Sequence, residues 1–244
     1  MDAISTSAAS GMRARMESLE MLANNLANVE TGGYKADREF YSIYTGEDAT
    51  LDPQTGDASA LPVIESQWID QSQGNLRNTS NPLDFAIDGT GFFAVQTPNG
   101  IRYTRNGSFR ISPAGALITQ DGNQVIAQTG GAIQLQPALP VEVTPDGAVN
   151  QGGQNVAQLQ LISYDPADLN KVGQNYFTPL DGAQPQAATG TILQGKVEQS
   201  NVGAAESAVR LVAIMRQFEM LQKAMNIGNE LNRRAVEEVA RVAA

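Results

Sequence analysis

The chain has 244 residues, of which 41% are hydrophobic, enough to build a buried core, and it carries a formal net charge of −10. Because an acidic surface repels phosphate groups, we do not expect it to bind nucleic acid. The sequence holds no histidine and no cysteine, which removes thiol nucleophiles, thiolate and imidazole metal ligands and the commonest general base, so much enzyme chemistry is excluded. The sequence also offers no convergent set of polar catalytic residues, so we expect no enzyme, no metal or cofactor and no small-molecule substrate.

The amino terminus reads Met1-Asp2-Ala3-Ile4-Ser5-Thr6 and lacks the basic head and apolar core of a secretory signal. The sequence also lacks a run of about 18 apolar residues that could span a membrane. We therefore expect neither a cleaved Sec-type signal nor a membrane-spanning helix.

Residues 3–28 are expected to form an amphipathic helix. Their apolar side chains recur at alternating spacings of three and four, which places them on one helical face. This predicted face consists of Ala9, Met12, Met16, Leu19, Ala23 and Leu26. The helix should end near Asn28, because Gly32 and Gly33 follow and glycine readily adopts the left-handed conformation of a helix end.

Residues 203–244 repeat this pattern without an interrupting proline. The positions at alternating spacings of three and four are Leu211, Ile214, Phe218, Leu221, Met225, Gly228, Asn232, Ala235, Val239 and Val242. A helix of about 40 residues would extend about 60 Å, longer than a compact domain of this size needs. We predict that it protrudes and that the two terminal helices pair as a coiled-coil-like layer.

Between the helices the apolar period changes to that of strands. Strands are expected at 85–87, 92–95, 102–104, 108–111, 116–119, 124–126, 141–143, 157–164 and 192–197. Pairs such as Asp88-Gly89, Asn106-Gly107 and Asp121-Gly122 separate several of them and are typical of hairpin turns. This spacing predicts an all-β antiparallel sandwich or barrel.

The predicted fold class is therefore α+β, with a central all-β domain between terminal helices. The expected parts are an amino-terminal helix of the assembly layer (1–33), an extended connector (34–79), the β domain (80–198) and a carboxyl-terminal helix of the assembly layer (199–244). Within the connector we expect one strand, around Val63 to Ile69.

Several polar motifs allow both a functional and a structural interpretation. The segment Gly89-Thr90-Gly91-Phe92-Phe93-Ala94 fits a dinucleotide-binding pattern, but a strand and not a helix is expected to follow, so a tight turn is favoured. Asp84 and Asp88 could form a carboxylate pair of a glycosidase, but no aromatic sugar platform accompanies them, so turn and edge roles are favoured. Asp165-Pro166-Ala167-Asp168 indicates an N-capped single turn.

The two terminal helices also imply assembly. Each has an apolar stripe, whereas the sheet between them has its own core, so the stripes must find other partners. The carboxyl-terminal stripe is the longer one, so pairing within the chain leaves apolar surface uncovered. Heterologous contacts between such surfaces propagate into rings or helical filaments. The pattern therefore favours the subunit of a fibre or tube.

Three segments resemble the signatures of flagellar basal-body rod and hook proteins. They are Asn24-Asn25-Leu26-Ala27-Asn28-Val29-Glu30-Thr31-Gly32-Gly33-Tyr34-Lys35; Asn81-Pro82-Leu83-Asp84-Phe85-Ala86-Ile87-Asp88-Gly89-Thr90-Gly91-Phe92-Phe93, leading into Tyr103-Thr104-Arg105-Asn106-Gly107-Ser108-Phe109; and Gly195-Lys196-Val197-Glu198-Gln199-Ser200-Asn201-Val202, followed by the last helix. The chain is thus similar to the rod protein family over nearly its whole length, and within the family it looks more like the proximal-rod members than the distal-rod members.

This resemblance implies a structural subunit of the rod that polymerises through its terminal helices and serves motility. It further implies export through the flagellar type III apparatus, other rod subunits and copies of itself as partners, and a place in the basal-body rod within the periplasm. A distal-rod or hook-type subunit and a non-flagellar fibre subunit are the alternatives.

The expected subunit interface follows the helical stripes and the first signature. It comprises Met12, Met16, Leu19, Asn25, Leu26, Asn28, Leu211, Ile214, Phe218, Leu221 and Met225. For Asn24, Asn25 and Asn28, spacing alone favours capping of the helix end over contacts with a neighbouring subunit. The resemblance strengthens the interface interpretation for Asn25 and Leu26.

Overall fold

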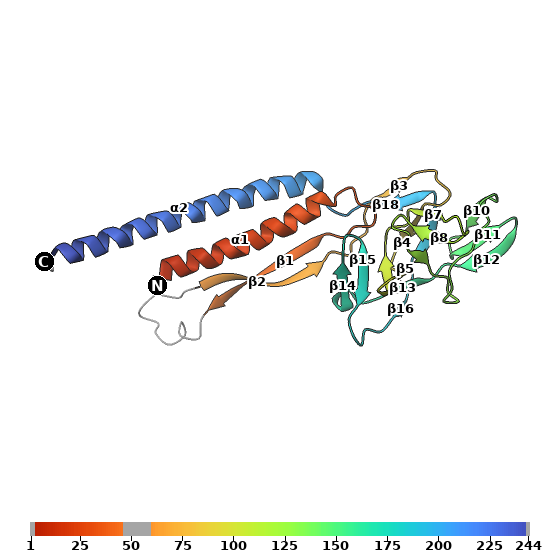
Figure 1. Cartoon of the computed structure of the whole chain (residues 1–244), viewed down its shortest axis with the longest axis horizontal. Coiled ribbons are helices and arrows are strands. Elements are labelled where there is room, and N and C mark those ends of the chain that lie inside the picture. Colours follow the sequence, from red (N-terminus) through yellow and green to blue (C-terminus); the bar gives the residue numbers. More distant parts are fainter. Residues whose placement is uncertain (1–2, 46–59, 243–244) are drawn as a thin grey trace. The chain divides into compact units, whose positions relative to one another are not determined.

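The structure is a computed structural model that describes residues 3–45 and 60–242 (Figure 1). The chain divides into two compact units. Unit 1 comprises Met1–Leu26, Asp37–Trp68 and Gly203–Ala244, and unit 2 comprises Ala27–Ala36 and Ile69–Val202. The described residues form helices at both ends of the chain and a large antiparallel β-rich region between them. The predicted α+β class is confirmed.

Unit 1 holds the two long helices. Helix α1 spans Ala3–Ala27 and helix α2 spans Ala204–Val242, which is 39 residues, so both predicted helices are confirmed. At the end of α1 the Thr31 N–H donates to the Asn28 carbonyl, and Gly33 has φ +67°. A Cβ at Gly33 would lie 2.4 Å from the Arg105 carbonyl carbon, so both backbone conformation and space require glycine there. None of the helices that the structure describes is long and apolar enough to cross a membrane.

The predicted connector contains more regular structure than expected. Strand β1 (Asp37–Thr45) pairs with strand β2 (Ala60–Ile69) in a two-stranded sheet. Strand β3 (Leu76–Asn78) belongs to unit 2. The strand predicted around 63–69 is therefore part of β2, and residues 46–59 of the connector lie outside the described residues.

The remaining described strands all lie in unit 2. They are β4 (Phe85–Asp88), β5 (Phe92–Thr97), β6 (Gly100–Thr104), β7 (Phe109–Ile111), β8 (Leu117–Thr119), β9 (Gln124–Val125), β10 (Val141–Val143), β11 (Ala148–Gln151), β12 (Gln154–Gln158), β13 (Leu161–Ser163), β14 (Leu169–Val172), β15 (Tyr176–Pro179), β16 (Gln186–Ala187), β17 (Thr191–Gln194) and β18 (Lys196–Glu198). The short 3₁₀ helix η2 (Pro166–Asp168) is capped by the Asp165 side chain, which accepts from the Ala167 N–H, so the predicted N-capped turn is confirmed.

Unit 2 is built from antiparallel pairs. A nine-stranded sheet runs in the order β14-β15-β6-β5-β9-β8-β7, with β13 paired to β5 and β16 paired to β13. Smaller sheets are β10-β11-β12, β17-β4 and β18-β3. No strand pair among the described residues joins β14 to β7, so this sheet is open and the barrel alternative is wrong.

The core of unit 2 lies on both faces of β5. Phe93 and Val95 point into one apolar cluster, while Phe92 and Ala94 point into a second. In the first cluster the Phe93 ring meets the Phe109 ring edge-on, with centroids 5.2 Å apart. Successive residues of a strand face opposite sides, so a strand buried on both sides needs the continuous apolar run that this segment has.

Candidate assembly site

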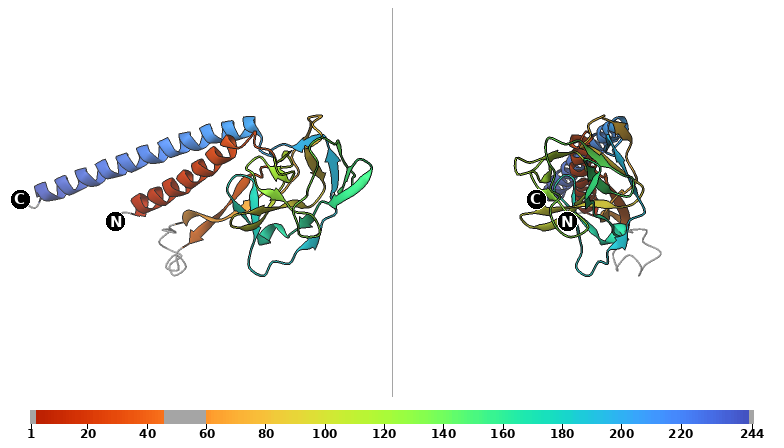
Figure 2. Two further views of the ribbon diagram at one scale, coloured as in Figure 1. Left: turned by 45° about the vertical axis from the view of Figure 1, so that its right-hand side comes forward. Right: turned by 90° about the vertical axis from the view of Figure 1, so that its right-hand side faces the viewer.

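The predicted stripe of α2 turns toward the rest of unit 1. Ile214 is 5% exposed, and the other predicted interface residues of this helix, Leu211, Phe218, Leu221 and Met225, are half-buried. Figures 1 and 2 show α1 running beside α2 in the opposite direction within this unit. The predicted stripe is thus covered in part within the chain.

A second apolar stripe of α2 is exposed. It consists of Val209, Val212, Met220, Ile227 and Leu231, whose exposed fractions are 50–72%. At 100° per residue these positions cluster on the side of the helix opposite Ile214. Sequence reasoning missed this stripe because Arg216 and Lys223 interrupt it and because the more regular stripe already satisfied the helical period. The spacing of seven and four from Met220 through Ile227 to Leu231 is the signal that could have found it.

On α1 the buried face is displaced from the predicted one. Ala14, Ser18 and Leu22 are buried, whereas Met16 is 51% exposed. The Ser18 hydroxyl donates to the Ala14 carbonyl at 2.9 Å, which allows this small polar residue to be buried. The predicted face was placed from the large apolar residues. The buried face instead carries the small residues Ala14 and Ser18, which allow close packing. Met16 therefore lies outside the buried face, and Met12, Leu19 and Leu26 lie half-buried at its margins.

Two asparagines of the first signature form contacts within the chain. The Asn25 side-chain amide donates to the Asp37 carbonyl at 2.8 Å and accepts from the Asp37 N–H at 3.0 Å. This pair of hydrogen bonds ties the end of α1 to the start of β1 inside unit 1. Asn28 is buried, and its side-chain oxygen accepts from the Thr31 hydroxyl at 3.2 Å. Asn25 thus binds a following strand, and Asn28 stabilises the turn after the helix.

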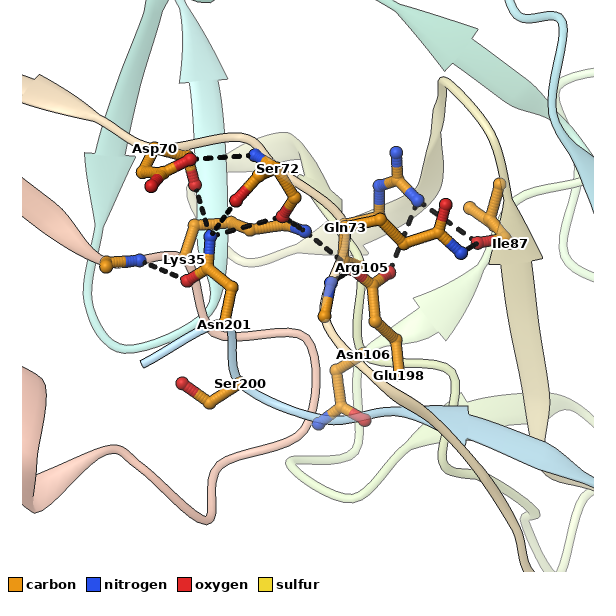
Figure 3. A network of polar contacts seen from close by, with 12 residues as sticks. Lys35, Asp70, Ser72, Gln73, Ile87, Arg105, Asn106, Glu198, Ser200 and Asn201 are labelled. Carbon is orange, nitrogen blue, oxygen red and sulfur yellow. Dashed lines mark hydrogen bonds and ion pairs between the residues drawn. The ribbon is translucent and has the colours of Figure 1, made fainter. Parts of the chain in front are cut away.

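Unit 2 contains a buried ion cluster, defined as Lys35, Arg105 and Glu198 (Figure 3). The Lys35 Nζ lies 2.5 Å from Glu198 Oε1, and Arg105 Nη1 lies 3.2 Å from Glu198 Oε2. All three residues are at most 5% exposed. Charges in such a place are stable only when paired and hydrogen-bonded.

Backbone groups complete the coordination of the ion cluster. Lys35 Nζ donates to the Ser72 carbonyl at 2.8 Å, and Arg105 Nη2 donates to the Gly89 carbonyl at 2.6 Å. The Gly74 N–H donates to Glu198 Oε1 at 3.0 Å. The cluster therefore joins residues of five separate stretches of the chain, at positions 35, 72–74, 89, 105 and 198.

Burial dominates the acid–base behaviour of both cations. It lowers the pKa of the Lys35 ammonium and the pKa of the Arg105 guanidinium from their ordinary values, while the Glu198 carboxylate opposes both shifts. One carboxylate thus faces two cations whose charged forms are stabilised mainly by it. Removal of Glu198 would leave both cations without this counter-charge.

Asn201 adds a second polar link beside the ion cluster (Figure 3). Its side-chain oxygen accepts from the Ala36 N–H at 2.8 Å. Its side-chain nitrogen donates to the carbonyls of Asp70, at 2.7 Å, and Ser72, at 3.1 Å. A single amide group therefore bridges the segment before β1 and the segment after β2.

Three family models match this chain. The model described as flagella basal body rod protein matches residues 6–35. The model of the flagellar hook protein FlgE/F/G D1 domain matches residues 86–151. The model of the flagellar basal body rod FlgEFG protein C-terminal matches residues 193–238.

Curated relatives match over almost the full length. The flagellar basal-body rod protein FlgF of Caulobacter vibrioides is 36% identical over 232 residues, which cover 92% of this chain and 92% of the relative. The flagellar basal-body rod protein FlgG of Buchnera aphidicola is 32% identical over 248 residues, covering 91% of this chain and 94% of the relative. FlgG of Caulobacter vibrioides is 31% identical over 256 residues, which cover 95% of this chain and 97% of the relative.

The chain belongs to the flagellar basal-body rod protein family. Its three matched regions each supply one member of the ion cluster, because Lys35 lies in the first, Arg105 in the second and Glu198 in the third. The signature segments of this rod protein therefore meet in the interior of unit 2, although they are far apart in sequence.

The turn at Gly89 has a structural role in the rod protein. Gly89 and Gly91 have φ +105° and +129°, and β5 follows directly, so the tight-turn interpretation is confirmed. Among the described residues, no group of three or more acidic, histidine or cysteine side chains is arranged to hold a metal ion.

Proposed function

We propose that this rod-family chain is an FlgF-type subunit of the proximal rod that polymerises through α1 and α2. The exposed stripe of α2 is the observation that carries the proposal. One face of such a helix packs inside its own unit, and the other face offers large apolar side chains to a neighbouring subunit. The helix can therefore make both contacts at once. Contacts of that kind between unlike surfaces propagate into a helical assembly.

Sequence identity favours the FlgF type over the FlgG type. The two Caulobacter vibrioides relatives differ in the expected direction, with 36% identity to FlgF and 31% identity to FlgG. A distal-rod subunit of the FlgG type is the second candidate, supported by the FlgG relative of Buchnera aphidicola at 32% identity.

The proposal extends to the route and place of assembly that family membership implies. The chain would leave the cytoplasm through the flagellar type III apparatus without a cleaved signal and bind other rod subunits in the periplasm. In the assembled rod, the terminal helices would form a coiled-coil-like layer and transmit torque because packed helices resist shear. Mass spectrometry of the assembled subunit, with the amino-terminal peptide intact, would support export without cleavage, whereas a shortened chain would contradict it.

A pair of substitutions tests the assembly surface. Ile227 is 62% exposed on the stripe, and Gln222 is exposed on another side of the same helix. Ile227→Asp and Gln222→Asp add the same charge to the same helix, so only the first places a carboxylate within an apolar contact. We expect Ile227→Asp to prevent polymerisation, measured by light scattering, and to abolish motility, while Gln222→Asp retains both.

Circular dichroism provides the control, because both variants should keep the β-sheet signal of unit 2. Normal polymers and motility with Ile227→Asp would contradict the exposed stripe as an interface. Leu221→Asp should also block assembly, because it places a charge on the half-buried face that packs within unit 1.

A further inference from the structure

The chain passes between its two units at four places, and three of these passages are flanked by connected segments of unit 2. The segment that precedes β1, the segment that follows β2 and the segment that precedes α2 are joined by backbone hydrogen bonds. These are Gly33 N–H to Glu198 O at 2.8 Å, Asp70 N–H to Ala36 O at 2.8 Å, and Gln199 N–H to Asn75 O at 2.9 Å. Each of the three segments is therefore bonded to at least one of the others.

The side chains of the ion cluster and Asn201 strengthen this meeting point. Lys35 reaches Ser72 and Glu198, so one ammonium group touches all three segments. Asn201 also touches all three, because it lies in the last segment and bridges Ala36 and Asp70. We call these three residues, Lys35, Glu198 and Asn201, with the backbone groups that they bind, the junction.

Backbone packing at the junction is close. A Cβ at Gly74 would lie 1.9 Å from the Gln199 carbonyl oxygen. Only glycine allows the two segments to approach so closely. The junction therefore combines direct backbone contact, a buried charge pair and a bridging amide.

We propose that the junction is a mechanical fastening point of the rod subunit, and this inference rests on the proposed rod function. Force carried by the helices reaches unit 2 through the chain segments that pass between the units. Pulled alone, the last of these segments would act on β18, which pairs with β3 over only Lys196–Glu198 and could separate one hydrogen bond at a time. The junction joins the segments, so their hydrogen bonds and the buried ion pair carry the load together.

Asn201→Ala tests the junction against a close control. Gln194 lies in the same unit, and its side-chain amide also binds three backbone groups, of Val143, Pro82 and Val141. Gln194→Ala removes the same kind of bridge at a place where no chain segment leaves the unit. Only Asn201→Ala should loosen the junction.

Hydrogen–deuterium exchange of the purified full chain gives the readout. The informative amides are those of Gly33 and Gln199, because neither is bonded to the Asn201 side chain. We expect Asn201→Ala to speed their exchange at least tenfold, and Gln194→Ala to change it less than twofold. Wild-type exchange of Gly33 and Gln199 in Asn201→Ala would overturn the junction as a connected unit.

Glu198→Gln supplies a second variant that keeps the shape of the side chain and removes its charge. It should accelerate the same two amides more than Asn201→Ala does, because both buried cations lose their counter-charge. If exchange became faster only at the Gly74 amide, which donates directly to the Glu198 carboxylate, the proposal would be contradicted.

A motility assay under load tests the mechanical role. In cells that depend on this chain for their rod, Asn201→Ala should assemble filaments but stop swimming at a lower medium viscosity than the wild type or Gln194→Ala. Equal swimming of all three at every viscosity would overturn the fastening role. Failure of the rod function itself would appear differently, as a wild-type chain that does not restore filaments, while the exchange result would stand unaffected.

Discussion

Helix α2 and the sheet of unit 2 show two different uses of apolar residues. Around β5 the large side chains face inward, and Phe93 is fully buried beside Phe109. On α2 large side chains remain on the surface, with Val209 72% exposed. Unit 2 therefore buries its large side chains in a core of its own, whereas α2 retains apolar surface that the described residues leave exposed.

Truncation to alanine in each region should distinguish a core side chain from an exposed one. The free energy of unfolding should fall most for the substitution in unit 2. Phe93→Ala removes a buried ring from the core, and we expect it to lower the free energy of unfolding by about 3–5 kcal/mol. Ile227→Ala removes a side chain from the exposed stripe, and it should change the stability of the monomer by less than about 0.5 kcal/mol. Urea unfolding followed by circular dichroism measures both values.

The effect of Ile227→Ala should appear in assembly and not in the stability of the monomer. Polymers of Ile227→Ala should be weaker because an intersubunit contact is lost. If Ile227→Ala destabilised the monomer as strongly as Phe93→Ala, the stripe would be part of the internal core and the comparison would fail.

The long helices were predictable because their evidence is local and repeated. Alternating spacings of three and four without proline gave both helices, and short apolar segments between turn sequences gave the strands from β4 to β10. The expected strands 157–164 and 192–197 were each wrong as single strands, because each region holds two strands, and β3, β11, β14, β15 and β16 were not expected. The pairing of β1 with β2 was missed because the partners are separated by residues 46–59. Yet a strand signal was present in the first partner. It is rich in aromatic residues and contains one β-branched residue, as is typical of strands, in the run Glu39-Phe40-Tyr41-Ser42-Ile43-Tyr44.

The ion cluster could not be predicted from spacing. Glu198 binds Arg105 across 93 positions and Lys35 across 163 positions, so no local period connects them. The family resemblance marked the segments that contain these residues but gave no reason to place them together. The exposed stripe of α2 was present in the sequence, but deciding which face of a helix is covered requires knowledge of what packs against it.

Alkaline pH provides a second, smaller probe of the core of unit 2, because Tyr103 and Tyr164 lie in the second apolar cluster beside β5. Burial, and after it the hydrogen bond that the Tyr103 hydroxyl shares with the Tyr164 hydroxyl, raise the pKa of Tyr103 above its ordinary value of 10.0. The folded state thus holds this proton more tightly than the unfolded state, so the contribution to stability is present below pH 10 and is lost as pH rises further. We expect the free energy of unfolding to fall above pH 10, by at most about 1.4 kcal/mol per pH unit from this group.

Tyr103→Phe isolates that contribution. The lowered pKa of Lys35 acts in the opposite direction, since stability rises with pH up to the ordinary lysine value of 10.5, but it acts equally in both proteins. The difference in stability between the wild type and Tyr103→Phe should therefore shrink between pH 10 and pH 11. A difference that stays constant across this range would show that the Tyr103 pKa is not raised by folding.

The smallest effect is expected from the surface charges of α2. Glu230 pairs with Arg233 at 2.8 Å and with Arg234 at 2.9 Å, and the three side chains are 40–71% exposed. Glu230→Gln should lower the free energy of unfolding by at most about 0.5 kcal/mol, and the loss should vanish at about 1 M salt, because exposed pairs are screened. Glu198→Gln, the same substitution in the buried cluster, should lower it by about 3–5 kcal/mol.

Urea unfolding at low and high salt measures both free energies of unfolding. If Glu230→Gln lowered the free energy of unfolding by more than about 1 kcal/mol, the charges of α2 would stabilise the fold more than exposed ion pairs usually do. If the small value holds, the ion pairs of α2 can change at little cost to the monomer. The apolar stripe of α2 would then be the part of the helix surface that selects its neighbour, while the buried charges of unit 2 hold together the chain segments that lead to the helices.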